Sequence, residues 1–547
     1  LAATRVDVNG LIEKGRENLL LNSIWNGVGS NVAPTSFAIT SFASGTFDAG
    51  SQENSIRFTA PTSADRIMIT QVPAITGVVT ASVYVEQIHS GSIIIADVIA
   101  RAGGSSNVIA FMEDGIVVNS NHLVSAGKTY SLTLSVASAV QWRFGVGTSG
   151  PTTGDITLSK PQVELGLVAT DYIETTTTSV SAGVLENEPR LDYSGGASCP
   201  SLLLEPSRTQ IITQSEYFGD AFWNKFNVIA ELIDFASPDG QNNSYKITET
   251  TSNAQHAIVV DFLNRPTLSA GSHTHSCFVR ANGVNDIVFY NNGTSGGAWV
   301  TIDLSDGTYN NLSGTATSAS VEPYENDWYR ISLTFTAVAG NTSPSIYLRV
   351  LGSYAGDGVS GIYMYGMQTE LGSYPTSYIP TYGTSQTRSP DKCYLQSADV
   401  HSDDSGTMFF EVGDYDTATA PDGFRKIITA NAVSASNIDN IIYFEEYAGS
   451  NTVLVRKNGI SILQTTPLYQ DLRNSKIAIK WSVEGAKVFI NGVLNKTYTG
   501  DASLNLQYFG YATSYSGDVL STIAIKQRVH FPTALNDSEC IALTKLG

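Results

Sequence analysis

The chain contains one stretch of seventeen residues twice, and this internal repeat constrains its architecture more than any other feature. The sequence QVELGLVATDYIETTTT starts at Gln162, and QTELGSYPTSYIPTYGT starts at Gln368. Solenoid repeats recur every ~20–50 residues, whereas this one recurs at a much longer period. The repeat therefore predicts two duplicated domains. The identities pair Gln162, Glu164, Leu165, Gly166, Thr170, Tyr172, Ile173, Thr175 and Thr178 with Gln368, Glu370, Leu371, Gly372, Thr376, Tyr378, Ile379, Thr381 and Thr384.

The fold class follows from the period of the apolar residues. Segments such as SVYVEQI from Ser82, WYRISLTFTAV from Trp328 and KIAIKWSV from Lys476 alternate with period two, as strands do. Turns rich in Gly, Asn, Ser and Asp separate them, and only 15% of residues are charged. These patterns predict an all-β chain of three tandem jelly-roll-like β-sandwich domains, with a β-hairpin connector and a short C-terminal helix.

Two local signals are specific. In ALNDSECIALTKL, Asn536 and Glu539 have the spacing of a capping box, which predicts a helix over 536–545. In VFINGVLNKTY, the pair Asn491–Gly492 predicts a tight hairpin turn. We also expect Trp142, Trp328 and Trp481 in the cores, because each lies in an alternating strand.

The repeat and the turn-rich segments divide the chain into five parts. Within the two repeat units, ASVYVEQ from Ala81 corresponds to HSCFVRA from His275. We expect the duplicated stretch to be a closing strand and exit turn, and therefore scaffold rather than a binding site. The predicted parts are an N-terminal connecting segment (1–18), jelly-roll domain 1 (19–180), a hairpin connector (181–209), jelly-roll domain 2 (210–388) and a third sandwich (389–547).

Charge and composition exclude several classes of function. The net charge is −19 and the isoelectric point is near 4.7, so the surface repels phosphate backbones and we expect no nucleic-acid partner. No run of eighteen apolar residues exists, so we expect no membrane insertion. Four cysteines are too few for a disulfide scaffold of this size. Because the chain begins with Leu1 rather than Met, we expect residues upstream of it.

Four motifs point to a family. TRVDVNGLIE, PRLDYSGGASCPSLLLEPSRTQII, QTELGSYPTSYIPTYGTSQTRSPD and FPTALNDSECIALTKL together resemble virion appendage proteins of tailed bacteriophages, of the tail-fibre and head-fibre type. In that group PRLDY…CPSLLLEP follows soon after TRV…NGLIE, whereas here the first repeat unit lies between them, as a domain insertion does. The two repeats are similar to carbohydrate-binding-module jelly rolls, and the third domain is similar to concanavalin-A-like and laminin-G-like sandwiches.

This resemblance implies a place and a set of partners. It implies a protein on the surface of the phage particle that contacts other virion proteins and assembles as a homo-oligomer, most often a trimer. It leaves open three functions on the same fold. The first is an adhesin, a fibre or spike that binds host cell-surface glycans as receptors. The second is a capsid decoration, head-fibre or tail protein with a purely architectural role, and the third is a polysaccharide-degrading enzyme.

Candidate ligand-binding residues lie beside turn-rich loops. Glycan binding uses exposed aromatic rings, and Trp299 in NNGTSGGAWV and Tyr354 in LGSYAGDG are the candidates. Asp403 and Asp404, beside His401, form an acidic loop that is a candidate Ca²⁺ site; otherwise we expect no cofactor.

We expect no catalytic residues. No nucleophile motif is present, and in FFEVGDYD the position two after Glu411 is Gly413, so two carboxylates do not share one strand face there. Glu445 and Glu446 follow in YFEEYA. In the stretch HTH, His273 and His275 can lie on one strand face, where two imidazoles could bind a metal. Because no third ligand is visible in the sequence, we predict an exposed strand instead.

Overall fold

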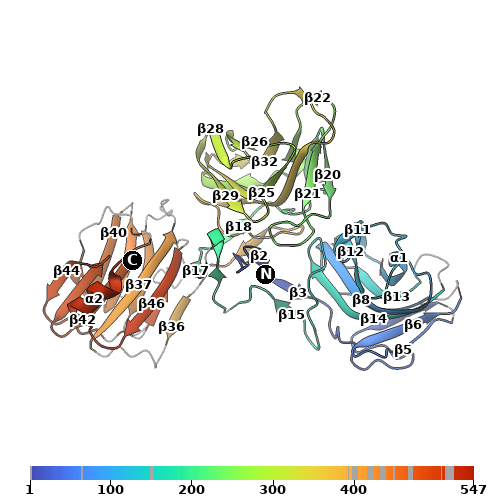
Figure 1. Cartoon of the computed structure of the whole chain (residues 1–547), viewed down its shortest axis with the longest axis horizontal. Helices are drawn as coiled ribbons and strands as arrows, with labels where there is room; N and C mark the ends of the chain where they lie inside the picture. Colours follow the sequence, from blue (N-terminus) through green and yellow to red (C-terminus); the bar gives the residue numbers. More distant parts are fainter. Residues whose placement is uncertain are drawn as a thin grey trace.

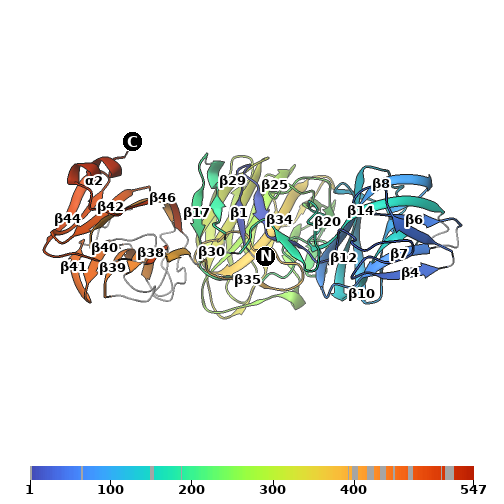
Figure 2. The same cartoon turned by 90° about the horizontal axis from the view of Figure 1, so that it is seen from below.

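The prediction of an all-β chain is confirmed. In the computed structural model strands account for 55% of the residues and helices for 4%. The chain forms three lobes around its N-terminal segment (Figure 1), and the view from below shows the lobes side by side (Figure 2). The structure describes residues 3–42, 44–62, 66–147, 153–186, 188–196, 198–391, 393–396, 404–415, 424–431, 439–447, 450–465, 472, 474–504, 506, 508–511 and 523–546.

Domain 1 is a sandwich of two antiparallel sheets, blue to teal in Figure 1. Side chains from both sheets, Trp142 among them, meet in one buried core. Within the described residues, the larger sheet has the order β11 (Ile116–Val118), β10 (Ser105–Glu113), β12 (Lys128–Ser138), β8 (Gly77–Gly91), β14 (Gly154–Leu165), β6 (Ser55–Ala60), β5 (Thr46–Ala49). The smaller sheet has the order β4 (Ala38–Phe42), β7 (Arg66–Gln71), β13 (Gln141–Val146), β9 (Ile99–Ala102), and α1 (Ile95–Val98) precedes β9.

Domain 2 is a second sandwich, green to yellow in Figure 1, and side chains from both of its sheets meet in a buried core. One sheet has the order β19 (Trp223–Phe226), β23 (Ala257–Val260), β32 (Pro344–Leu348), β26 (Asp286–Asn291), β27 (Ala298–Asp303), β28 (Thr308–Gly314). The other has the order β20 (Val228–Leu232), β21 (Tyr245–Glu249), β34 (Gly361–Leu371), β25 (Gly271–Asn282), β30 (Trp328–Ala337), β29 (Ala316–Tyr324). Short strand pairs flank them: β18 (Arg208–Gln210) with β35 (Gln386–Arg388), β22 (Asn253–Ala254) with β33 (Tyr354–Ala355), and β24 (Thr267–Leu268) with β31 (Gly340–Asn341).

Domain 3 takes two of its strands from the connector. The hairpin β16–β17 joins the edge of a domain 3 sheet through the pairing of β17 with β46, so this sheet combines segments far apart in the sequence. As far as the structure describes it, that sheet has the order β16 (Leu191–Asp192), β17 (Ser201–Leu204), β46 (Ile523–Phe531), β37 (Gly406–Tyr415), β42 (Lys476–Ser482), β43 (Gly485–Ile490), β44 (Val493–Thr499). The opposite sheet has the order β36 (Cys393–Gln396), β45 (Tyr508–Tyr511), β38 (Phe424–Asn431), β39 (Ile441–Tyr447), β40 (Ser450–Lys457), β41 (Ile460–Gln464).

The specific local predictions for the C-terminal part hold. Helix α2 (Asp537–Thr544) begins after Asn536, whose side chain accepts from the backbone N–H of Glu539 in a complete capping box. Asn491 and Gly492 connect β43 to β44 with φ of 50° and 81°, as a tight hairpin turn requires. Of the helices in the described ranges, none is long and apolar enough to cross a membrane.

The duplicated stretch forms the last long strand of each repeat unit and the turn after it. β14 and β34 each pair with a strand on both sides, so the stretch lies inside its sheet. The residues Gly166 and Gly372 have φ of 140° and 142°, a conformation that L side chains rarely adopt, and both supply the bend after the strand. The predicted correspondence of ASVYVEQ with HSCFVRA is confirmed, because Ser82 pairs with Gln162 as Ser276 pairs with Gln368.

The N-terminal segment connects domain 1, domain 2 and the connector. Its hairpin of β1 (Thr4–Val6) and β2 (Ile12–Lys14) contacts domain 2 through the bond from Ile12 N–H to the Pro238 carbonyl (2.9 Å). It contacts the connector through the bond from Tyr193 N–H to the Val6 carbonyl (3.0 Å). β3 (Arg16–Asn18) pairs with β15 (Val180–Ala182) beside domain 1. These contacts hold the segment at the centre of the molecule, where Figure 1 places the N-terminus.

A buried ion network joins the connector to the exit of domain 2. The Arg190 guanidinium donates to Glu205 (2.9 Å) and to Asp391, and Arg388 also pairs with Glu205 (2.9 Å). Arg190 reaches the N-terminal segment as well, through the Thr4 carbonyl (2.9 Å). All four charged groups come from PRLDY, LLLEP and TRSPD, so these motifs build the junction between domains 2 and 3.

Candidate functional site: an aromatic face on domain 2

Strand alternation places three aromatic side chains on the outer side of one domain 2 sheet. In β26 and β27, Phe289 and Val300 point into the core, so the neighbouring Tyr290 and Trp299 point outward. Tyr347 in β32 lies outward for the same reason. All three side chains are half-buried. We call Tyr290, Trp299 and Tyr347 the aromatic face.

The three rings contact one another in a row across neighbouring strands. Tyr290 lies directly opposite Trp299 in the β26–β27 ladder, and their ring centroids are 5.7 Å apart at an interplanar angle of 49°. On the other side, Tyr290 meets Tyr347 at 6.0 Å and 81°, an edge-to-face contact. Aromatic pairs at this separation attract one another, so the contacts favour this arrangement of the rings without a ligand.

Polar and cationic groups border the aromatic face. Burial raises the pKa of the Tyr347 phenol, which is therefore neutral at physiological pH. The side chain of Asn292 hydrogen-bonds to this phenol. Arg265 lies near Tyr347 and over the ring of Phe262 (5.2 Å to the centroid). Phe262 is 70% exposed. The face thus offers apolar ring surfaces next to hydrogen-bonding groups.

Such a surface suits ligands that are apolar on one side and polar on the other. Rings bind the C–H faces of sugars, while amide, phenol and guanidinium groups bind hydroxyls, and a few placed polar groups then set the orientation. Because the rings already contact one another, little side-chain freedom is lost on binding.

Trp299, one of the two predicted ligand-binding residues, lies in the aromatic face, and Tyr354 lies in a separate cluster. The Tyr354 hydroxyl donates to Glu249 (2.7 Å), and its ring packs on His256 with centroids 4.6 Å apart. Arg349 donates twice to the same Glu249 carboxylate (3.0 Å each). Burial and the neighbouring carboxylate raise the pKa of Tyr354. Its polar atom is therefore used within the domain.

Of the two candidate Ca²⁺ residues, only Asp404 belongs to the residues that the structure describes. Asp403 lies outside the described residues, and Asp404 is exposed. No three His, Cys, Asp or Glu side chains come together as a metal site in the described parts of the chain.

The prediction of an exposed strand at His273 and His275 is wrong. β25 lies between β34 and β30 at the centre of its sheet, and the two side chains are 3% and 0% exposed. His275 hydrogen-bonds to Thr369 (2.9 Å), and burial lowers its pKa to about 3. Both imidazoles are therefore neutral packing residues at physiological pH.

The acidic residues considered for catalysis belong to domain 3. Glu411 lies on β37 and is half-buried, and the side chains of Glu445 and Glu446 lie outside the described residues.

The three tryptophans predicted as core, Trp142, Trp328 and Trp481, are 0%, 1% and 0% exposed, as expected.

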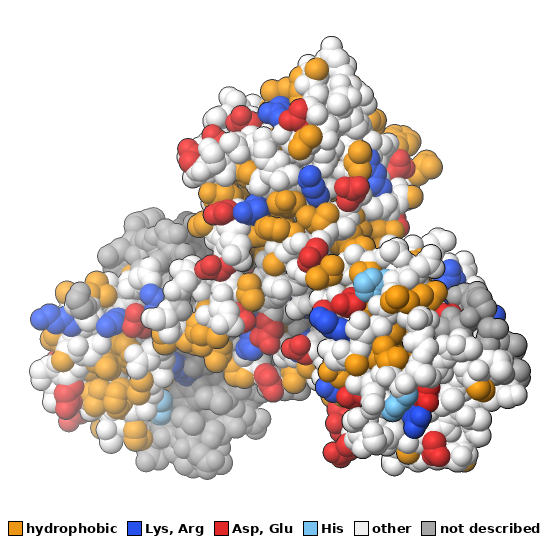
Figure 3. Space-filling model, turned by 45° about the vertical axis from the view of Figure 1, so that its right-hand side comes forward, with side chains coloured by type: hydrophobic (Ala, Val, Ile, Leu, Met, Phe, Trp, Pro, Cys, Tyr) orange, Lys and Arg blue, Asp and Glu red, His pale blue; other side chains and the backbone are white. Residues whose placement is uncertain are grey.

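Sequence reasoning missed Tyr290 and Tyr347. A signal was present, because both alternate with core residues in the runs DIVFYN and SIYLRV. Their contact with Trp299 depends on the strand order β32-β26-β27, which no single segment reveals. Charge gave no indication of the site either, because charged side chains are scattered over the visible surface (Figure 3).

The fold and this site define the chain as a tandem β-sandwich protein. No protein-family model and no curated protein matches it. Among solved structures, it is similar to the CBM40 of the Ruminococcus gnavus IT-sialidase bound to α2,3-sialyllactose (17% identity over 26% of this chain and 84% of that one, TM-score 0.22).

The chain is also similar to two further solved structures. One is the botulinum neurotoxin serotype G binding domain (18% identity, 27% of this chain and 38% of that one, TM-score 0.22). The other is domains LG4-5 of the mouse laminin α1 chain (8% identity, 52% of this chain and 92% of that one, TM-score 0.18).

Proposed function

We propose that the chain is an adhesin on the surface of a tailed-phage particle and binds host cell-surface glycans through the aromatic face of domain 2. The single observation that carries the proposal is the row of contacting, outward-facing rings of Tyr290, Trp299 and Tyr347. The four appendage-like motifs of the sequence support the location on the particle. The protein works by binding rather than by chemistry.

The junctions of the molecule fit this role. The buried pairs around Glu205 and the strands that the connector adds to domain 3 hold neighbouring domains in fixed relation. A fixed arrangement presents the aromatic face at a constant orientation from the particle. Each shallow face binds weakly, so a homotrimer and many copies per particle supply the strength through multivalency.

The same junctions favour a second candidate function, a capsid decoration, head-fibre or tail protein with a purely architectural role. Segments distant in sequence interlock at the centre of the molecule, as a load-carrying protein requires. In that case the aromatic face would contact another virion protein instead of a glycan.

Incubation of the purified protein with host cells and with host surface polysaccharide tests the proposal. We expect the protein to coat the cells and the polysaccharide to keep its chain length. Shortening of the polysaccharide that Glu411→Gln or Glu445→Gln abolishes would replace the adhesin with an enzyme. Absence of both coating and cleavage, with the protein seen on particles by electron microscopy, would favour the architectural role.

A further inference from the structure

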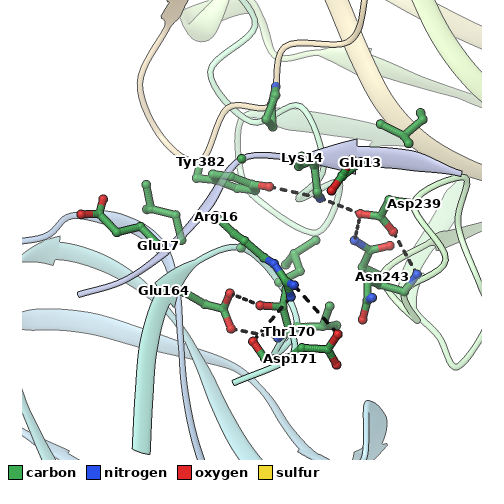
Figure 4. A pocket seen from close by; sticks show the side chains of 18 of the residues that line it. Glu13, Lys14, Arg16, Glu17, Glu164, Thr170, Asp171, Asp239, Asn243 and Tyr382 are labelled. Atoms are coloured by element: carbon green, nitrogen blue, oxygen red, sulfur yellow. Dashed lines mark hydrogen bonds and ion pairs between the residues drawn. The ribbon is translucent and has the colours of Figure 1, made fainter. Parts of the chain in front are cut away.

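Domain 1, domain 2 and the N-terminal segment enclose a cavity of about 340 Å³, which is within the range of small-molecule sites (Figure 4). Junctions between domains are places where such sites occur preferentially. One wall is the N-terminal segment from Leu11 to Leu19, and another is the turn after β14 with Thr170 and Asp171. The third wall belongs to domain 2 and includes Asn243.

Some charged groups that line this cavity already make their ion pairs and hydrogen bonds with other protein groups. The Lys14 ammonium pairs with Asp239 (2.6 Å) and Glu216 (3.1 Å) and donates to the Tyr365 hydroxyl (3.1 Å). Asp239 also accepts from the Gln241 N–H (3.0 Å). These groups build the wall and leave little bonding capacity for a ligand.

Two other groups retain unused capacity. Arg16 extends toward Thr170 and Asp171 (Figure 4), and its contacts with Asp171 are long: 3.5 Å to the carbonyl and 3.9 Å to the carboxylate. Asn243 is 2% exposed and donates its amide N–H to Asp239 (3.1 Å), while its Oδ1 has no hydrogen-bond partner. Arg16 therefore has N–H groups left for a ligand oxygen, whereas Asn243 Oδ1 is buried too deeply for a ligand to reach it.

The rest of the lining fits a sugar. The lining contains hydroxyl and amide side chains as well as apolar ones, so the cavity offers both kinds of contact that a pyranose ring makes. Acidic residues outnumber the two cations Lys14 and Arg16, which disfavours an anionic ligand. The neutral polar side chains are Thr76, Thr170, Gln241, Asn243, Thr384 and Gln386. The apolar and aromatic ones include Leu11, Leu165, Leu167, Val168, Pro380 and Tyr382.

We propose that this cavity between domains 1 and 2 binds a neutral sugar unit, with Arg16 donating to a sugar oxygen and the neutral polar side chains of the lining bonding to sugar hydroxyls. The inference rests on the proposed glycan-binding function and adds to it a second site of a different kind. The aromatic face holds a glycan chain on an open surface, whereas the cavity holds a single unit at a domain junction.

The test is titration of the full chain with free lactose, cellobiose and chitobiose, and with sialyllactose as the acidic comparison, followed by calorimetry and saturation-transfer NMR. We expect at least one neutral disaccharide to bind at millimolar concentration and sialyllactose to bind more weakly than lactose. Arg16→Ala should weaken binding about tenfold, and Thr384→Trp should abolish it by filling the cavity. Arg57→Ala is the matched control, because Arg57 pairs with Asp155 on the surface of domain 1.

The outcomes separate this inference from the proposed function. Neutral disaccharide binding that survives Trp299→Ala and is lost in Arg16→Ala supports the cavity. Binding that is lost in Trp299→Ala but unchanged in Arg16→Ala and Thr384→Trp overturns the cavity site and leaves the adhesin standing. Absence of disaccharide binding, or tighter binding of sialyllactose than of lactose, also overturns the cavity site. Cell coating tests the proposed adhesin function independently. Unchanged thermal unfolding of both cavity variants excludes misfolding as the cause.

Discussion

Glu164 and Glu370 occupy the same position in the two duplicated domains and hold the same set of hydrogen bonds. Each carboxylate accepts from the backbone N–H of a threonine six positions later, at 2.8 Å in both domains. The same threonine donates its hydroxyl, at 2.6 Å to Glu164 and 2.7 Å to Glu370. The two side chains are each 1% exposed. The duplicated stretch therefore exists to fasten the turn after the last long strand.

Removing the hydroxyl from these turns should destabilise both domains alike. Thr170→Val and Thr376→Val each remove one hydrogen bond to a buried carboxylate, so we expect a loss of ~1.5–3 kcal/mol in each domain. Hydrogen exchange of peptides from β14 and β34 gives the free energy of opening domain by domain. Each variant should change only its own domain. If both variants lowered the free energy of opening in the same domain only, the shared role of Glu164 and Glu370 would be contradicted.

Replacement of Lys14 should destabilise the chain far more than replacement of a surface lysine. Burial pushes the pKa of Asp239 upward, but Lys14, with hydrogen bonds from Ser237 and Gln241, outweighs burial and the net pKa is lowered. Lys14→Met leaves Asp239 and Glu216 buried without a cation, and we expect a loss of ~3–5 kcal/mol. Thermal unfolding measures this loss of stability. Adding Asp239→Asn to Lys14→Met should restore part of it.

Lys128→Met is the matched control for Lys14. Lys128 pairs with Asp114 at the surface (2.6 Å), where water screens the pair, and we expect little change in thermal unfolding. Equal effects of the two substitutions would contradict the assigned role of Lys14.

Much of the fold could be predicted from the sequence because the signals were local. Period-two alternation, the capping box at Asn536 and the turn at Asn491–Gly492 each act within a few residues. The capture of β16–β17 by the domain 3 sheet could not be predicted, because strand partners far apart in the sequence are set by tertiary packing. The aromatic face could be predicted only in part for the same reason. Trp299 lies beside a turn-rich loop that the sequence shows, whereas its contacts with Tyr290 and Tyr347 depend on strand order.

Acid should weaken the junction between domains 2 and 3. Burial pushes the pKa of Glu205 upward, but Arg388 and Arg190 outweigh it and lower the pKa to about 2. A carboxylate with a lowered folded pKa stabilises the fold above its unfolded pKa of about 4.3, and this contribution is lost as pH falls toward 2. The stability difference between the unmodified chain and Glu205→Gln should be largest at neutral pH and shrink below about pH 4. A difference that stays constant from pH 7 to pH 2 would contradict this account.

Tyr354 should matter for stability rather than for adhesion. Tyr354→Phe keeps the ring on His256 and removes the hydrogen bond to Glu249, so we expect ~1 kcal/mol lower stability with unchanged cell coating. Thermal unfolding and cell binding of the same preparation check both parts. Reduced coating at full stability would place Tyr354 in the ligand site.

Binding of aromatic-face variants to host cells tests the central claim most directly. Tyr290→Ala and Trp299→Ala should each lower cell coating about tenfold or more while the domain stays folded. Tyr309→Ala is the matched control, because Tyr309 is a 46% exposed tyrosine on edge strand β28 of the same sheet and should bind as the unmodified chain does. Coating by Tyr290→Ala and Trp299→Ala equal to that of Tyr309→Ala would contradict the assignment of the aromatic face as the adhesive site.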